Sequence, residues 1–163
     1  MDTALLRALA EHRPSIRAQW EKLLRLDRGT TALARPDTLV HLIDATLDEV
    51  YAKLPAWSAR RQAYRPPEPV CPCGRSPFLA YFACGRQALH EGLVTVQASR
   101  PGLTPPDRDE AFARLDQVFS RIARREIESF CSVCQFHPLP EGRYQSAPGA
   151  ASCRMPASLP ASR

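Results

Sequence analysis

The sequence lacks the features that direct a chain into or across a membrane. No apolar run approaches the roughly 20 residues that a helix needs to span a bilayer. The opening Met-Asp-Thr-Ala-Leu-Leu-Arg has no basic segment that leads into an unbroken apolar core, so it does not read as a signal peptide. We therefore expect a cytoplasmic protein with no membrane association, in a compartment where thiols stay reduced.

Lysine is almost absent, although the formal net charge is +5. Lys22 and Lys53 are the only lysines, and arginine carries the rest of the positive charge. A nucleic-acid surface is usually a concentrated basic stripe, whereas the pairs Arg60-Arg61 and Arg124-Arg125 are small and the second pair adjoins acidic residues. This pattern disfavours nucleic-acid binding, which we keep as a third hypothesis behind the two developed below.

The common catalytic motifs are also missing. The sequence has no glycine-rich phosphate loop, no Gly-x-Ser-x-Gly and no His-Glu-x-x-His. It also lacks the Glu-x-x-His pairs that hold di-iron centres in helical bundles. Glu126 and Glu128 are better explained as a charged helix face with the neighbouring arginines. We therefore predict a protein that is not an enzyme.

The 163 residues, 44% of them hydrophobic, suit one domain with a sizeable core. Strand-like alternation is lacking, and apolar residues recur at helical spacing over residues 3–26, 36–54, 76–99 and 104–136. Pro14 interrupts the first of these runs, and a further helical piece is expected at 56–64. Short links between helices predict an all-α fold, an antiparallel four-helix bundle over residues 1–137. Residues 138–163 are rich in Pro, Ala and Ser and predict a disordered C-terminal tail.

Two of the predicted helices have recognisable start signals. Ser76-Pro77 is expected to begin the third helix, with serine as its cap and proline in the first position. Thr104-Pro105 is expected to begin the fourth helix, and Asp107 favours its positive end.

Two cysteine motifs flank this predicted helical hairpin: Cys71-Pro-Cys73-Gly74 before it, and Cys131-Ser-Val-Cys134 at its far end. With the turn centred near Gly102, an antiparallel pairing puts Cys73 opposite Cys131 and Val70 opposite Cys134. The segment before Ser76 is expected to be extended, so the match is approximate. Both motifs nevertheless fall at the same end of the bundle, and Gly74 frees the backbone to turn there.

Four convergent thiols predict a metal site formed by Cys71, Cys73, Cys131 and Cys134. Zinc is favoured because four thiolates in a tetrahedron form a common structural zinc site. An iron–sulfur cluster, which also takes four thiolates, is the alternative and would make the protein an electron-transfer or redox module. A redox-switching thiol set and inert buried cysteines stay open. His137 is a substitute ligand candidate.

For the two other cysteines and for His90 we expect no role as metal ligands. In the same antiparallel pairing, Cys84 lies approximately opposite Ser120, far from the cysteine motifs, and is expected in the core. Cys153 lies in the predicted tail as a free thiol. His90 is expected to be solvated or hydrogen-bonded rather than a ligand.

The run Pro14-Ser-Ile-Arg-Ala-Gln-Trp20 with Leu23-Leu24, followed by Leu39 to Leu54, resembles the RsbRD class. This class comprises the N-terminal sensor domains of RsbR-type bacterial stress regulators, and similar helical domains precede some histidine kinases. The block from Cys73 to Phe82, with the second cysteine motif, looks like a cysteine-bearing variant of such domains. The resemblance covers roughly residues 3–136.

The resemblance implies a sensor domain that passes a signal to a partner. No kinase or other output domain follows the predicted bundle, so we expect a separate, unidentified signalling protein as the partner. A homodimer through an exposed apolar stripe is a further option. A bound metal would either fasten the bundle or, on thiol oxidation, leave it and free the first cysteine motif.

Overall fold

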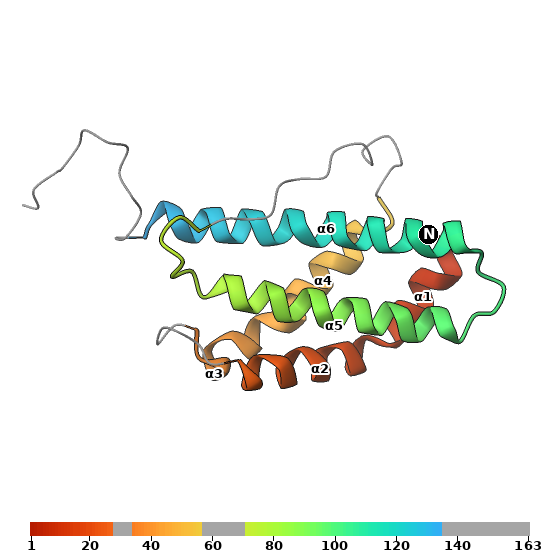
Figure 1. The fold of residues 1–163 in the computed structure, drawn as a ribbon, viewed down its shortest axis with the longest axis horizontal. Coiled ribbons are helices and arrows are strands. Elements are labelled where there is room, and N and C mark those ends of the chain that lie inside the picture. Colours follow the sequence, from red (N-terminus) through yellow and green to blue (C-terminus); the bar gives the residue numbers. More distant parts are fainter. Residues whose placement is uncertain (28–33, 57–70, 135–163) are drawn as a thin grey trace, which may run out of the picture.

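The computed structural model describes residues 1–27, 34–56 and 71–134, and every regular element in these ranges is helical (Figure 1). The helices are α1 (Thr3–Glu11), α2 (Arg13–Leu26), α3 (Pro36–Leu39), η2 (Val40–Leu42), α4 (Ile43–Lys53), α5 (Phe78–Ala98) and α6 (Pro105–Ser132). The all-α prediction is confirmed for these ranges. Residues 57–64 of the piece expected at 56–64 lie outside them, as does the predicted tail.

Two of the predicted helices are divided in the structure. The first is split at His12 into α1 and α2, and Pro14 lies in the first turn of α2, where its missing N–H is not needed. The second is split into α3 and α4 by a 3-10 turn, η2. Among the described residues 1–27, 34–56 and 71–134, no helix is long and apolar enough to cross a membrane.

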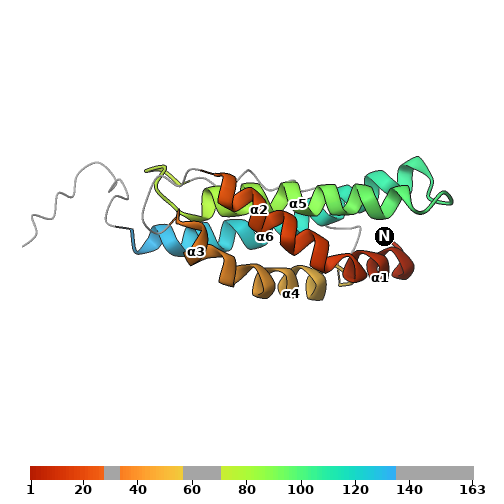
Figure 2. The same cartoon turned by 90° about the horizontal axis from the view of Figure 1, so that it is seen from below.

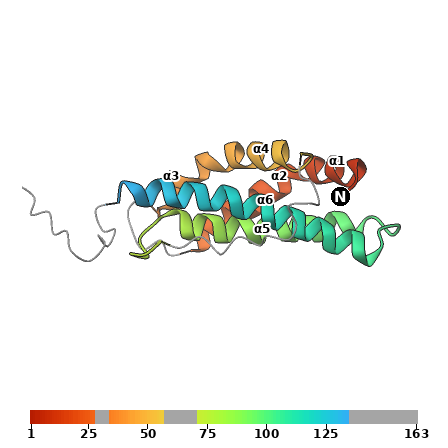
Figure 3. The same cartoon turned by 90° about the horizontal axis from the view of Figure 1, so that it is seen from above.

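Four helices contact one another in a closed circuit: α2 packs on α5, α5 on α6, α6 on α4, and α4 on α2. Figures 2 and 3 show α4 lying along one side of the α5–α6 pair. Figure 1 shows α1 bent away from the axis of α2. The inward faces form one core that contains Leu9, Ile16, Trp20, Ile43, Leu47, Leu89, Leu93, Leu115, Phe119 and Ile127, all 2% exposed or less.

The α2–α5 contact depends on one large and one small residue. Trp20 of α2 is fully buried, and its indole Nε1 donates a hydrogen bond of 3.0 Å to the carbonyl of Tyr81. A Cβ added at Gly85 would lie only 2.2 Å from Cζ2 of this indole ring. Gly85 is therefore the residue that allows α5 to approach α2 so closely.

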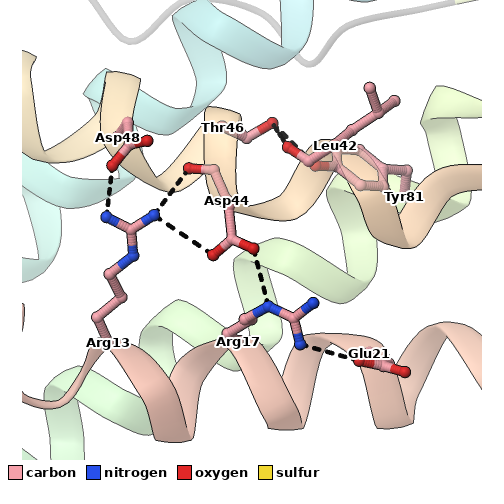
Figure 4. A network of polar contacts seen from close by, with 8 residues as sticks. All are labelled: Arg13, Arg17, Glu21, Leu42, Asp44, Thr46, Asp48 and Tyr81. Atoms are coloured by element: carbon pink, nitrogen blue, oxygen red, sulfur yellow. Dashed lines mark hydrogen bonds and ion pairs between the residues drawn. The ribbon is translucent and has the colours of Figure 1, made fainter.

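Ion pairs fasten α2 to α4 on the outer surface (Figure 4). The Arg17 guanidinium donates to Asp44 at 2.9 Å, while Arg13 contacts both Asp44 and Asp48. These pairs are largely solvent-exposed, so each contributes little to stability. They define which faces of the two helices meet.

The α5–α6 hairpin carries both cysteine motifs. The two helices run in opposite directions (Figure 1), and α6 begins with the predicted cap. The Thr104 hydroxyl accepts from the Asp107 amide, and the Asp107 carboxylate accepts from the Thr104 amide, which is a complete capping box. With 28 residues, α6 is about 42 Å long and reaches back to the start of α5.

The prediction that Ser76 caps α5 is wrong. The helix begins at Phe78, its N-cap residue is Pro77, and no side chain caps it. The Ser76 hydroxyl is buried without a hydrogen-bond partner. The turn that precedes α5 instead places the Ser76 backbone in a hydrogen bond to the Cys71 sulfur.

Candidate metal centre

The first cysteine motif forms a tight turn. The Gly74 amide donates to the Cys71 carbonyl at 2.9 Å, and Gly74 has a positive φ of 66°. This left-handed conformation disfavours residues with a side chain, so glycine is needed at this position. The predicted role of Gly74 in turning the backbone is confirmed.

The second motif ends α6. Cys131 lies in the last helical turn, and the Cys134 amide donates to the Cys131 carbonyl at 3.2 Å just beyond it. This local bond closes a turn that keeps Cys134 next to the end of the helix. The end of α6 is thus placed against the turn before α5.

The thiols of the two motifs meet. The Sγ atoms of Cys71 and Cys73 are 3.4 Å apart, and those of Cys73 and Cys134 are 3.8 Å apart. Cys131 shares a hydrogen bond with Cys71. The contacts therefore run in a chain, Cys131–Cys71–Cys73–Cys134, and join two segments that are about 60 residues apart in the sequence.

The cluster has a buried and an accessible side. Cys71 and Cys131 are each 7% exposed, whereas Cys73 and Cys134 are half-buried. The rings of Phe78 and Phe130 pack edge to face at 5.9 Å near the same end of the hairpin. Any group that reaches the thiols from solvent therefore meets Cys73 and Cys134 first.

The surroundings favour one thiolate in particular. Burial opposes ionisation of Cys71, but hydrogen bonds from the Cys73 and Cys131 thiols and the Arg75 and Ser76 backbone outweigh it and lower its pKa to about 7. Burial raises the pKa of Cys131 to about 11, and the neighbouring Cys71 reinforces this. The turn therefore supplies backbone donors to a thiolate, a contribution that sequence reasoning missed; Gly74 was the signal for it.

The spacing of the sulfurs can be compared with a zinc site. A tetrahedron of thiolates with Zn–S bonds of about 2.3 Å has S–S edges of about 3.8 Å. The two measured distances, 3.4 and 3.8 Å, are close to such an edge. In a cluster of several irons the thiolates are divided among separate metal atoms, which places most of them farther apart.

The four thiols are not arranged as a complete set of metal ligands. Among residues 1–27, 34–56 and 71–134, no group of three or more His, Cys, Asp or Glu side chains is arranged so that it could hold a metal ion. The sulfurs form a chain of neighbours rather than a tetrahedron, so binding would require rotation of side chains about χ1. The donor types and two of the spacings fit zinc, and the full arrangement does not.

The predicted register is not the observed one. Cys73 was expected opposite Cys131, but the structure places its thiol 3.8 Å from that of Cys134. Cys71 contacts Cys131 instead. The reason is that the segment before Ser76 turns back at Gly74 rather than running extended. Val70, the other residue of that prediction, lies outside the described residues.

The remaining candidates lie away from the thiols or outside the described part. Cys84 packs against the core as predicted, and burial raises its pKa. His90 is on α5 beside Asp116, with Nε2 3.8 Å from the carboxylate. This nitrogen is buried without a hydrogen-bond partner, so the expectation of a solvated or hydrogen-bonded His90 is wrong at this atom. His137 and Cys153 belong to the range 135–163, which the structure does not describe.

No protein-family model, curated protein or solved structure matches this chain. The function is therefore inferred from the chemistry of the thiol cluster and from the fold that positions it.

Proposed function

We propose that this chain is a cytoplasmic regulatory domain in which Cys71, Cys73, Cys131 and Cys134 bind one zinc ion. The observation that carries the proposal is the meeting of two cysteine motifs, about 60 residues apart, with sulfurs 3.4 and 3.8 Å apart. Because thiols are strong zinc ligands only when deprotonated, the hydrogen bonds donated to Cys71 also support it.

The closed circuit of helix contacts supports the finer fold assignment, an antiparallel four-helix bundle formed by α2, α4, α5 and α6. In such a bundle the zinc would fasten the start of α5 to the end of α6. Ligand binding that occurs only in the folded state adds its free energy to folding. The ion would therefore stabilise the end of the hairpin that has no connecting turn.

The regulatory role rests on two further points. The sequence contains none of the common catalytic motifs, and its pattern of Trp20 and spaced leucines resembles sensor domains of the RsbRD class. A site at one end of a hairpin can alter the surface offered to a signalling partner when its ligands change. We infer that a separate protein reads this surface.

The first test is metal analysis of protein purified without chelator under anaerobic conditions, together with a visible absorption spectrum. One zinc per chain is expected, and it should be lost in Cys71→Ser/Cys134→Ser. Cys84→Ser, which removes a thiol away from the cluster, is the matched control and should retain the zinc. Iron with visible absorbance would support the cluster alternative, and absence of any metal would refute the site.

Hydrogen exchange of the zinc-loaded and the metal-free protein distinguishes a zinc ion that stabilises the whole fold from one that controls only the local surface. Faster exchange confined to residues 71–77 and the last turns of α6 would indicate a local switch. Faster exchange in every helix would indicate that zinc holds the whole fold. Unchanged exchange at both cysteine motifs would contradict zinc ligation by these residues.

A further inference from the structure

The four thiols differ in accessibility, and this difference bears on how the cluster would respond to an oxidant. Cys73 and Cys134 are half-buried, while Cys71 and Cys131 are each 7% exposed. With zinc bound, all four would be thiolates, so acidity would not distinguish them. Access from solvent would then decide which sulfur reacts first.

We propose that Cys73 and Cys134 form a reversible disulfide on reaction with a hydroperoxide, and that this cross-link replaces zinc as the fastening between α5 and α6. The release of zinc rests on the proposed function above. The equal ionisation of the four thiols rests on it too, whereas the choice of the pair among equally ionised thiols rests on their accessibility and on the contacts that restrain Cys71.

The chemistry balances with hydrogen peroxide, the simplest hydroperoxide, as the oxidant. The Cys73 thiolate attacks one peroxide oxygen, the O–O bond breaks, and a sulfenic acid and a hydroxide form. The Cys134 thiolate then attacks the sulfenic sulfur, the S–S bond forms, and a second hydroxide leaves. Each sulfur loses one electron, the peroxide gains two, and two protons from solvent convert both hydroxides to water.

The distance between the two sulfurs suits this step. A disulfide is about 2.05 Å long, so the 3.8 Å separation of Cys73 and Cys134 must shorten by about 1.8 Å. Cys134 lies two residues beyond the end of α6, at Ser132, so it is outside the helical hydrogen-bonding pattern that holds Cys131. Rotation about the two χ1 angles and a small movement of this terminal segment would close the gap.

Cys71 is the competing partner, because its sulfur is 3.4 Å from that of Cys73. It is also the more firmly held thiol: it is buried and accepts hydrogen bonds from the backbone of Arg75 and Ser76. A link between Cys71 and Cys73 would require breaking these bonds, and Pro72 between them restricts the backbone. These restraints favour Cys134.

The two disulfides have opposite consequences for the protein. A Cys71–Cys73 link lies within one turn and would leave the start of α5 free of α6. A Cys73–Cys134 link joins the two segments and would keep the hairpin end closed while zinc leaves. The protein would thus release its metal without opening, and thiol reductants would restore the original site.

The test uses the full zinc-loaded chain carrying Cys84→Ser and Cys153→Ser, treated with about one equivalent of hydrogen peroxide and then alkylated. Cleavage after arginine leaves Cys71 and Cys73 on the peptide 62–75, and Cys131 and Cys134 on the peptide 126–143. The expected product joins these peptides, with roughly two thiols lost and the zinc released. A disulfide within either peptide, or sulfinic acid without a disulfide, would overturn the proposal.

Two double variants in the same background identify the pair. Cys71→Ser/Cys131→Ser retains the accessible thiols and should form a disulfide roughly tenfold faster than Cys73→Ser/Cys134→Ser, which retains the buried ones. Equal rates, or the reverse order, would refute the assignment. Protein that never binds zinc would refute the proposed function instead, and its peptide map would still decide which disulfide forms.

Discussion

The close approach of α2 to α5 makes Gly85 the position where one added methyl group should have the largest effect. A Cβ at Gly85 would lie 2.2, 2.5 and 2.6 Å from Cζ2, Cε2 and Cη2 of Trp20. Side-chain Cβ atoms do not approach other carbons this closely, so Gly85→Ala requires the indole or the helix to move. The indole has little room, because it packs on Tyr81 at 4.8 Å and on Phe119 at 5.8 Å.

The expected cost follows from these contacts. Overpacking in a core typically costs about 1–3 kcal/mol, and displacing the indole weakens its hydrogen bond to the Tyr81 carbonyl, worth about 1 kcal/mol. Alanine is a better helix former than glycine by about 1 kcal/mol, which offsets part of this loss. We expect Gly85→Ala to lower the free energy of unfolding by about 2 kcal/mol, or roughly 4–8 °C in Tm.

The assay is urea unfolding followed by helical circular dichroism, at fixed metal content. Gly102→Ala is the matched control, because no atom lies within 4 Å of its added Cβ and its φ is not positive. This control should be neutral or stabilising by up to about 1 kcal/mol. Adding Trp20→Phe to Gly85→Ala removes part of the ring that clashes, so the double variant should be less destabilised than the sum of the two single variants.

Equal stability of Gly85→Ala and Gly102→Ala, with an unchanged slope of the unfolding free energy against urea concentration, would refute the close packing of Trp20 on Gly85. Additive effects of Gly85→Ala and Trp20→Phe would also count against it, because residues in direct contact should couple. Either result would mean that α2 and α5 are not packed as closely as the structure has them.

Two further predictions concern arginines of α6. Arg114 donates to the Leu54 carbonyl at the end of α4 at 2.8 Å, so Arg114→Met should lower the free energy of unfolding by about 1–2 kcal/mol in urea. Arg125, and after it Lys53, holds the pKa of Glu49 at about 2 in the folded protein. Because this folded pKa is below the unfolded value of about 4.5, the stabilisation is present above pH 4.5 and is lost as the pH falls toward 2. Glu49→Gln should cost about 1 kcal/mol at pH 7, after discounting for solvent screening, and flatten the pH dependence of unfolding between pH 4.5 and 2.

The controls for these two predictions are simple. Arg7→Met replaces an exposed arginine of α1 and should change stability by less than about 0.5 kcal/mol. A loss as large as that of Arg114→Met would show that the carbonyl contacts are not the cause. For Glu49→Gln, a pH dependence that matches the wild-type curve would show that the Arg125 pair does not link protonation to folding.

The sequence alone determined which of the described segments are helical and where the two cysteine motifs lie. Apolar spacing predicted the helices because a buried stripe must recur every three or four residues, and the described helices follow it. Thr104 and Asp107 predicted the start of α6, since a capping box depends only on residues three apart. The two cysteine motifs were predicted at one end because helix lengths and a short turn fix where a hairpin begins and ends.

The tertiary structure decided which residues within these segments meet. The pairing of Cys73 with Cys134 depends on the turn at Gly74, whose left-handed backbone reverses a segment that a length count treats as extended. Ser76 fails as a cap for the same reason, because the turn commits its backbone before α5 begins. The contact of Gly85 with Trp20 joins residues on separate helices, and no local pattern specifies which glycine receives which ring. Local hydrogen bonds and periodicity are properties of neighbouring residues, whereas these contacts depend on how whole helices pack.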